Sequence, residues 1–322
     1  NLAFCLIFGN GVLFLTSRGS AKLLPQESRI AHDVASVHML NFSATAVPDL
    51  AAPFRLPWPA ERSVPQGIRS PWRRPAVNVA LEEILRARVA TAGGPGFFVC
   101  SRNAPAVIVG RNQDAQAERT RWARSRGVPV FRRTSGGGAV YHDDGNLNWS
   151  WIVPGGLADR DRLLGRILAV LRRLDVAAEE GPRGGVYVAG RKIGGTACAA
   201  GKGVLLFHGT LLVSTDLDEL RATLAAHAPA YPERPPGSAA RGGVASVPAE
   251  LATLARLRPG LDVEALETAL FAALARQGRP AAPADVLADT EWSALRRLSR
   301  DYARASWIFR RRPPAKPKRG LP

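Results

Sequence analysis

Three stretches of the sequence carry residue types that hold anions. The first, at residues 132–143, reads RRTSGGGAVYHD and sets two arginines before three consecutive glycines. Glycines adopt left-handed backbone conformations, so successive N–H groups can point at one anion. An arginine beside them can pair with a phosphate or a carboxylate through two parallel hydrogen bonds. The stretch is therefore a candidate anion site, although a tight turn with solvent-facing arginines has the same pattern.

The other two stretches each hold one functional side chain. Lys192 lies within YVAGRKIGGTA at residues 187–197, where two glycines after the lysine let a ligand approach the backbone. His208 lies within the apolar run FHGTLL at residues 207–212. Taken alone, such a lysine is more typical of a solvated strand end, and such a histidine of a hydrogen-bonded core residue. No stretch matches a P-loop, a dinucleotide fingerprint or a zinc-protease motif.

The periodicity of apolar residues indicates the elements that position these stretches. Residues 78–90 set their apolar side chains at helical spacing and leave Glu82 and Glu83 facing outward. Further helices are predicted at 115–126, 163–174, 217–227, 262–276 and 290–304, and strands at 97–102, 106–111, 129–133, 139–142, 147–153, 186–197 and 204–213. Strands and helices do not alternate strictly, which predicts an α+β fold with a mixed, mainly antiparallel sheet flanked by helices.

Composition limits the function classes. The chain has 322 residues, no run of 18 apolar residues and a net charge of +17, so we expect no membrane span and an acidic partner. Outside a tail with six basic residues at 310–319, the basic residues are dispersed, so we do not expect nucleic-acid binding. Three widely spaced cysteines exclude a disulfide framework and fit a reducing compartment, so we expect a cytoplasmic protein.

The chain divides into three parts. We expect residues 1–74 to form an irregular N-terminal extension, or to be translated sequence upstream of a start at Met39, the only methionine. A signal peptide or a transit peptide is the alternative for the apolar run at residues 1–16, although its basic residues follow the run. Residues 75–310 form the predicted catalytic domain, and the Pro- and Arg-rich residues 311–322 form a disordered basic tail.

Five motifs, in this order and spacing, resemble the lipoate–protein ligase A family over about residues 75–310. They are NVALEE at 78–83, VIVGRNQ at 107–113, RRTSGGGAVYHDDGN at 132–146, GRKIGGTA at 190–197 and HGTLL at 208–212. The resemblance implies the catalytic-domain fold of biotin protein ligases and class II synthetases. It also implies a ligase that uses ATP and Mg²⁺ to convert lipoate into lipoyl-AMP. The lipoyl group then passes to a lysine of a carrier domain, in an E2 subunit of a 2-oxoacid dehydrogenase or in the glycine-cleavage H protein.

The resemblance also assigns roles to residues. Lys192 is the catalytic residue, because it bridges the α-phosphate and the acyl carbonyl. The residues implied to hold ATP or the adenylate are Arg133, Gly137, Gly138, Ala139, Val140, Tyr141, Asn146 and Lys192, with Arg111 as a further phosphate candidate. Those implied to hold lipoate are Arg133, Lys192 and His208. No residue is assigned to a metal.

The sequence departs from the family pattern at several positions. Gly184 and Gly185 stand where the family often has an Asn-Asp pair, and Gly194 replaces a serine. Phe207 replaces the first of two histidines. The chain ends soon after residue 309, so we expect the C-terminal accessory domain, which some relatives carry as a separate protein, to be absent.

Two alternatives stay open. An octanoyl or lipoyl transferase of the same fold takes a pre-activated acyl donor. When such an enzyme uses a cysteine, the thiol precedes the lysine motif, where residues 180–184 hold none; Cys198 follows it. The other alternative is a non-catalytic paralogue that binds lipoylated domains.

Overall fold

The computed structural model describes residues 4–8, 11–15, 21–22, 55–60, 63–227 and 246–310. Its contacts divide the chain into two units, Asn1–Thr45 and Ala46–Pro322. In the first unit, β1 (Phe4–Phe8), β2 (Gly11–Leu15) and β3 (Ala21–Lys22) form an antiparallel sheet. The sequence pattern predicts no regular element there. The second unit holds everything that follows.

A five-stranded sheet forms the centre of the second unit. Its strand order is β13 (Thr196–Gly201), β14 (Val204–Leu212), β9 (Asn146–Pro154), β5 (Phe97–Ser101) and β4 (Gln66–Arg69). Neighbouring strands are antiparallel, except that β4 and β5 are parallel. β14 and β9 pair along their whole length, from Val204 opposite Pro154 to Leu212 opposite Asn146. This long pair forms the centre of the sheet, since β13 pairs with β14 on one side and β5 pairs with β9 on the other.

Two smaller sheets carry the glycine-rich stretches. β6 (Ala106–Val109) lies between β7 (Val130–Arg132), which is parallel to it, and β8 (Val140–His142), which is antiparallel. The triple-glycine turn connects β7 to β8. β10 (Glu179–Glu180), β11 (Val186–Val188) and β12 (Arg191–Gly194) form an antiparallel sheet that ends in the lysine motif. The predicted α+β class with a mainly antiparallel sheet is therefore confirmed.

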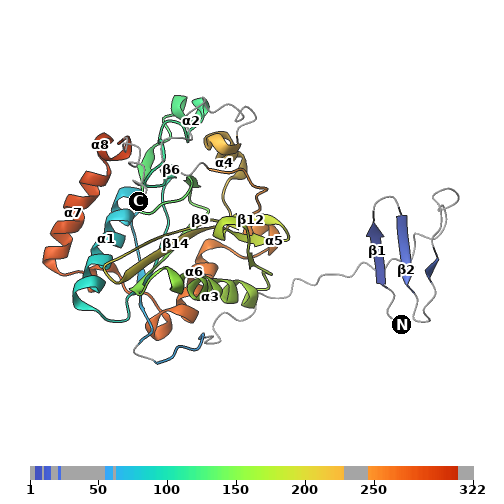
Figure 1. Ribbon diagram of the computed structural model, residues 1–322, viewed down its shortest axis with the longest axis horizontal. Coiled ribbons are helices and arrows are strands. Elements are labelled where there is room, and N and C mark those ends of the chain that lie inside the picture. The colour runs from blue at the N-terminus through green and yellow to red at the C-terminus, as the bar shows by residue number, and fades with distance from the viewer. Residues whose placement is uncertain are drawn as a thin grey trace, which may run out of the picture. The chain divides into compact units, whose positions relative to one another are not determined.

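Helices cover both faces of the central sheet (Figure 1). Side chains alternate between the two faces along β5, so Phe97 and Val99 pack with α1 (Pro75–Ala92) and α7 (Asp289–Tyr302). Phe98 and Cys100 point to the opposite face, towards α3 (Arg160–Arg173) and α6 (Val263–Leu274). The remaining helices are α2 (Arg121–Ser125), α4 (Leu217–Thr223), α5 (Leu254–Leu257) and α8 (Ala305–Ile308). None of the helices in the described residues is long and apolar enough to cross a membrane.

Two predicted elements differ from the structure, and one strand of the structure was not predicted. The helix predicted at 115–126 is wrong in its first half, because Thr120 caps the helix: its side chain accepts a hydrogen bond from the N–H of Ala123. The single strand predicted at 186–197 is three strands, because the chain turns back at Gly190 (φ 74°) between β11 and β12 and changes sheet at Gly195. The short parallel strand β4 lies in sequence that lacks a strand pattern.

Candidate active site

One cavity of about 260 Å³ opens where the glycine-rich turn, β12 and β14 meet. The predicted site residues that line it are Arg133, Gly137, Gly138, Ala139, Val140, Tyr141, Lys192 and His208. The lining also includes residues that the sequence analysis did not select, among them Asn78, Glu82, His142, Trp149, Ser150, Arg183 and His227. The structure thus brings together motifs that lie up to about 130 residues apart in the chain, from Asn78 to His208.

Arg133 holds the glycine-rich turn in shape. Its guanidinium donates hydrogen bonds to the carbonyl oxygens of Gly136 (2.6 Å), Gly138 (2.8 Å) and Ile108 (3.1 Å), and its Nε donates to Ser135 Oγ (3.0 Å). Burial lowers the pKa of this guanidinium to about 10, so it stays charged at neutral pH. Since these hydrogen bonds go to protein atoms, the first task of Arg133 in this structure is to position the turn.

The turn packs closely against the end of β6. A Cβ atom placed on Gly110 would lie 2.1 Å from the carbonyl oxygen of Gly137, so only glycine fits there. Gly137 itself has φ 89°, a backbone conformation that side chains disfavour. By contrast, a Cβ on Gly136 would meet no atom within 4 Å. Close packing on Gly110 and the left-handed backbone at Gly137 therefore position the turn.

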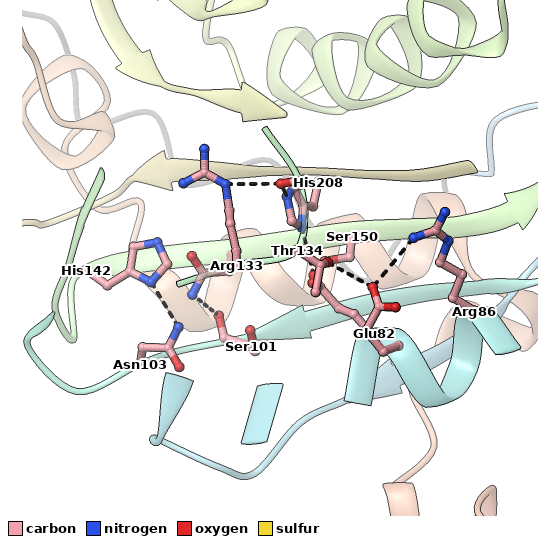
Figure 2. A network of polar contacts seen from close by, with 12 residues as sticks. Glu82, Arg86, Ser101, Asn103, Arg133, Thr134, His142, Ser150 and His208 are labelled. Atoms are coloured by element: carbon pink, nitrogen blue, oxygen red, sulfur yellow. Dashed lines mark hydrogen bonds and ion pairs between the residues drawn. The ribbon is translucent and has the colours of Figure 1, made fainter. Parts of the chain in front are cut away.

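A hydrogen-bonded chain connects α1 to the turn (Figure 2). The Oε1 atom of Glu82 lies 2.9 Å from His208 Nδ1 and accepts a hydrogen bond from Ser150 Oγ. On the other side of the ring, His208 Nε2 lies 2.7 Å from Ser135 Oγ, the atom that Arg133 Nε also contacts. His208 is thus a hydrogen-bonded histidine, as expected from its apolar run, and it also faces the cavity.

The prediction that Glu82 and Glu83 face outward is wrong. Their side chains are only 13% and 23% exposed, and Glu83 accepts a hydrogen bond from Thr134 Oγ1 (2.8 Å). The turn of α1 that carries them faces polar groups of the sheet and of the glycine-rich turn. A helical face that packs against a polar site has the same periodicity as a solvated face, so the pattern could not distinguish the two.

A second chain of polar side chains orients His142. Ser70 Oγ donates to Asn78 Oδ1 (2.5 Å), and Asn78 Nδ2 donates to Asn103 Oδ1 (2.8 Å). The amide nitrogen of Asn103 therefore faces His142 Nδ1 (2.9 Å), which accepts, so the ring proton lies on Nε2. His142 lines the cavity, and its buried Nε2 atom has no hydrogen-bond partner among the described residues. Burial, followed by the charges of Arg133 and His208, lowers the pKa of His142 to about 3.

Lys192 is held by its backbone and leaves its side chain for a ligand. Its N–H donates to the carbonyl of Glu250 (2.7 Å), and its carbonyl accepts from the N–H of Ala252 (3.1 Å). The structure shows no hydrogen bond or ion pair for the ammonium group within the described part of the chain. Burial, and secondly the nearby charge of Arg183, lowers the pKa of Lys192. A half-buried cation without a counter-charge is a strong candidate for binding an anion.

The structure does not bring Asn146, Arg111 or Cys198 to the cavity wall. Asn146 lies one position behind it: its Nδ2 donates to Oδ1 of Asn148 (2.9 Å), which does line the cavity. The Arg111 side chain is exposed, and only its backbone N–H contacts the turn, at Ser135 O (2.8 Å). Cys198 packs against the core on β13, so no thiol lines the cavity in the part of the chain that the structure describes.

The cavity does not fit a magnesium ion held by the protein. Mg²⁺ prefers carboxylate oxygens, and Glu82 contributes the only carboxylate of the described cavity lining. That carboxylate already contacts His208 and Ser150. No cluster of three His, Cys, Asp or Glu side chains suited to a metal occurs among the described residues.

The sequence and the fold are both similar to known proteins. The model of the lipoyl protein ligase A/B catalytic domain matches residues 74–275. Lipoate–protein ligase 1 of Staphylococcus aureus is 30% identical over 245 residues, which are 74% of this chain and 71% of that protein. Lipoate-protein ligase LplJ of Bacillus subtilis is 35% identical over 154 residues, which are 47% of this chain and 46% of that protein.

Solved structures share the fold. A bipartite lipoate protein ligase of Thermoplasma acidophilum, described with its E2 lipoyl domain, superimposes with a TM-score of 0.61 at 24% identity. The match covers 76% of this chain and 96% of that one. A lipoate-protein ligase A bound with ATP superimposes with a TM-score of 0.60 at 23% identity, covering 76% of this chain and 98% of that one.

The close packing of the turn predicts the effect of two glycine substitutions. Gly110→Ala should lower the free energy of unfolding by roughly 1–3 kcal/mol, because the new methyl group collides with the Gly137 carbonyl and the turn must move. Gly136→Ala, the matched control in the same turn, should change it by less than about 0.5 kcal/mol, since nothing lies near its Cβ. Urea unfolding monitored by circular dichroism measures both. Equal effects of the two substitutions would show that the turn is not packed as described.

The buried neutral His142 predicts a dependence of stability on pH. Its folded pKa of about 3 lies below the ordinary value of 6.5, so the unfolded chain binds a proton that the folded chain excludes. Its contribution is therefore complete above pH 6.5 and is lost as the pH falls, by about 1.4 kcal/mol per pH unit. Replacing His142 by Asn, which retains an acceptor for Asn103, should reduce the slope of unfolding free energy between pH 6 and 4 by about that amount. Identical slopes for the two proteins would contradict the buried neutral state.

Proposed function

The chain belongs to the lipoyl protein ligase A/B catalytic-domain family, and from this premise we propose that it is a lipoate–protein ligase. It activates lipoate with ATP as lipoyl-AMP and transfers the lipoyl group to a lysine of a lipoyl carrier domain. The observation that carries this proposal is the shared cavity of Lys192 and the glycine-rich turn. The ammonium group of Lys192, which has no partner among the described residues, lines that cavity together with a turn whose shape depends on a buried arginine.

The residues suit the chemistry of acyl activation. A carboxylate is a weak acyl donor, so it attacks the α-phosphate of ATP, forms a mixed anhydride and releases pyrophosphate. Negative charge develops on phosphate oxygens in this step and on the acyl oxygen when the amine of the carrier attacks. The ammonium group of Lys192 neutralises charge in both steps, and the N–H groups of Gly137 and Gly138, which line the same cavity, donate to the same oxygens. His142 lines the same cavity and carries its ring proton on the buried Nε2 atom.

The cavity also suits an aliphatic acid. Its wall includes the apolar side chains of Val79, Ile108, Trp149, Leu212 and Leu251 beside the polar groups. An acyl chain loses contact with water against such a surface, at about 25 cal/mol for each Å² of apolar area buried. Arg133, Lys192 and His208 would then contact the polar end of lipoate and its surroundings, and Gly137–Tyr141 the adenylate. Asn146 would contribute indirectly, by holding the side chain of Asn148, which lines the cavity.

Cofactor and partners follow from the same proposal. Because the described lining offers no carboxylate set, Mg²⁺ enters as the complex with its substrate ATP and not as a resident ion. The carrier is a lipoyl domain of a 2-oxoacid dehydrogenase E2 subunit or the glycine-cleavage H protein. The reaction takes place in the cytoplasm, as the isolated cysteines indicate.

The proposal favours the ligase over a cysteine-dependent transferase. Such a transferase needs a thiolate next to the acyl group, and no cysteine lines the cavity in the described residues. A transferase that accepts lipoyl-AMP made by another enzyme needs no thiol. It differs from a ligase in one reaction, because it catalyses no exchange of pyrophosphate into ATP.

Substitution of Lys192 tests the proposal. Lys192→Ala should reduce lipoate-dependent exchange of labelled pyrophosphate into ATP at least 100-fold, because the developing charge loses its counter-ion in a half-buried site. The matched control is Lys202→Ala, in the exposed turn between β13 and β14, which should change the rate less than twofold. A wild-type protein without exchange activity that still transfers lipoyl from lipoyl-AMP would identify the transferase. Loss of both reactions only on Cys198→Ala would identify the cysteine enzyme.

A further inference from the structure

The cavity contains a cluster of basic side chains that the proposed mechanism does not fully use. Arg183 and His227 line the same cavity as Lys192, from the loop before β11 and from the end of the segment after α4. The structure shows no hydrogen bond or ion pair for the guanidinium of Arg183 among the described residues. Two positively charged groups therefore share one cavity, and neither has a hydrogen bond or ion pair to a carboxylate among the described residues. An anion bound between them would reduce their mutual repulsion.

The two glycines that follow Arg183 keep acidic side chains away from the basic cluster. A Cβ on Gly184, where φ is 71°, would lie 2.2 Å from Arg160 Nη2 and 3.1 Å from Thr196 Oγ1. A Cβ on Gly185 would lie 2.7 Å from the Tyr187 ring and 3.2 Å from Lys192 Cε. The space that acidic side chains would need at these positions is therefore occupied. Arg160 itself is neutralised by Asp161 and Glu180, so it does not add to the cluster.

The backbone of Arg183 points to the same conclusion. It has φ 58° and ψ 28°, a left-handed conformation that a non-glycine residue adopts at a cost in free energy. Its side chain is exposed at the edge of the cavity, and no hydrogen bond or ion pair to another described residue offsets this cost. An arginine kept in such a conformation beside a half-buried lysine is explained if the side chain binds a ligand. Electrostatic repulsion between the two is also visible in Lys192, whose pKa Arg183 helps to lower.

We propose that Arg183, Lys192 and His227 form a binding site for the pyrophosphate part of ATP, in which side chains of the protein contact the phosphate oxygens directly. The assignment rests on the proposed ATP-dependent activation. Burial, and secondly the charges of Lys192 and Arg221, lowers the pKa of His227, so its ring is neutral at pH 7.5 and contributes a hydrogen bond and not a charge. Arg183 and Lys192 carry the charge that the departing pyrophosphate needs.

The first experiment measures pyrophosphate binding to the full chain by isothermal titration calorimetry, with EDTA present. Arg183→Gln should weaken binding at least tenfold. The matched control is Arg191→Gln, which removes the same charge from β12, one residue before Lys192, at a side chain that does not line the cavity. It should change the affinity less than twofold. Equal losses in the two variants, or no pyrophosphate binding by the wild-type protein, would overturn the proposal.

The second experiment separates the two half-reactions. Arg183→Gln should raise the KM for ATP about tenfold in pyrophosphate exchange. It should leave transfer from prepared lipoyl-AMP to a lipoyl domain unchanged, because lipoyl-AMP contains no pyrophosphate. If transfer falls as much as exchange, the cluster holds the adenylate or the carrier, and the assignment is wrong. If the wild-type protein performs no exchange but binds pyrophosphate through Arg183, the proposed function fails while the binding site stands.

Two further variants exclude an effect on folding. Arg183→Gly relieves the left-handed backbone, so the melting temperature should stay the same or rise while pyrophosphate affinity falls as in Arg183→Gln. Arg183→Lys keeps the charge and should retain most of the affinity. A lower melting temperature for Arg183→Gly, with wild-type affinity for pyrophosphate, would show that Arg183 serves the fold and not a ligand.

Discussion

The site depends on the buried guanidinium of Arg133. A buried cation is stable only if its N–H groups are hydrogen-bonded, and here carbonyl oxygens of Ile108, Gly136 and Gly138 accept those bonds. These bonds determine the path of the chain between β7 and β8. Glycine is required at positions 110 and 137, because the turn packs closely against Gly110 and has a left-handed backbone at Gly137. The positions of the other cavity groups relative to this turn then follow from the sheet.

The central sheet sets those positions by its register. β9 and β14 are paired residue by residue, so Ser150 lies opposite His208 and Trp149 opposite Gly209. α1, packed on the same sheet, presents Glu82 to both Ser150 and His208. The lysine strand is joined separately, through the backbone bonds of Lys192 to residues 250 and 252. One side of the cavity therefore consists of polar side chains that the sheet and α1 position, and another side carries the cation Lys192, which a separate strand positions.

The sequence predicted the elements whose patterns are local. The structure confirms the helices predicted at 78–90, 163–174 and 262–276 and the strands around the glycine-rich turn. Their conformation can be predicted from local apolar spacing or from turn residues. The sequence-based prediction was wrong where the conformation or burial of a residue depends on a segment that lies far away in the chain. The pattern of α1 predicts an exposed Glu82, whereas in the folded protein Glu82 contacts His208 of the sheet. The sequence of β4 has no strand pattern, and it forms a strand because it pairs with β5. His142, Arg183 and His227 joined the cavity unselected, since their proximity comes from the folded chain and not from spacing. The SGGGAVYHD motif was nevertheless a usable signal for His142.

The packing of α7 against α1 has a consequence for how the protein is made. The apolar face of α1 is complete once Ala92 leaves the ribosome, but the helix that covers its neighbouring surface begins only at Asp289, about 200 residues later. At a rate of synthesis of about 5–20 residues per second, that surface stays uncovered for roughly 10–40 s. The apolar layer that contains Leu81 and Leu85 is thus incomplete during most of translation, and a chaperone can bind it during that time.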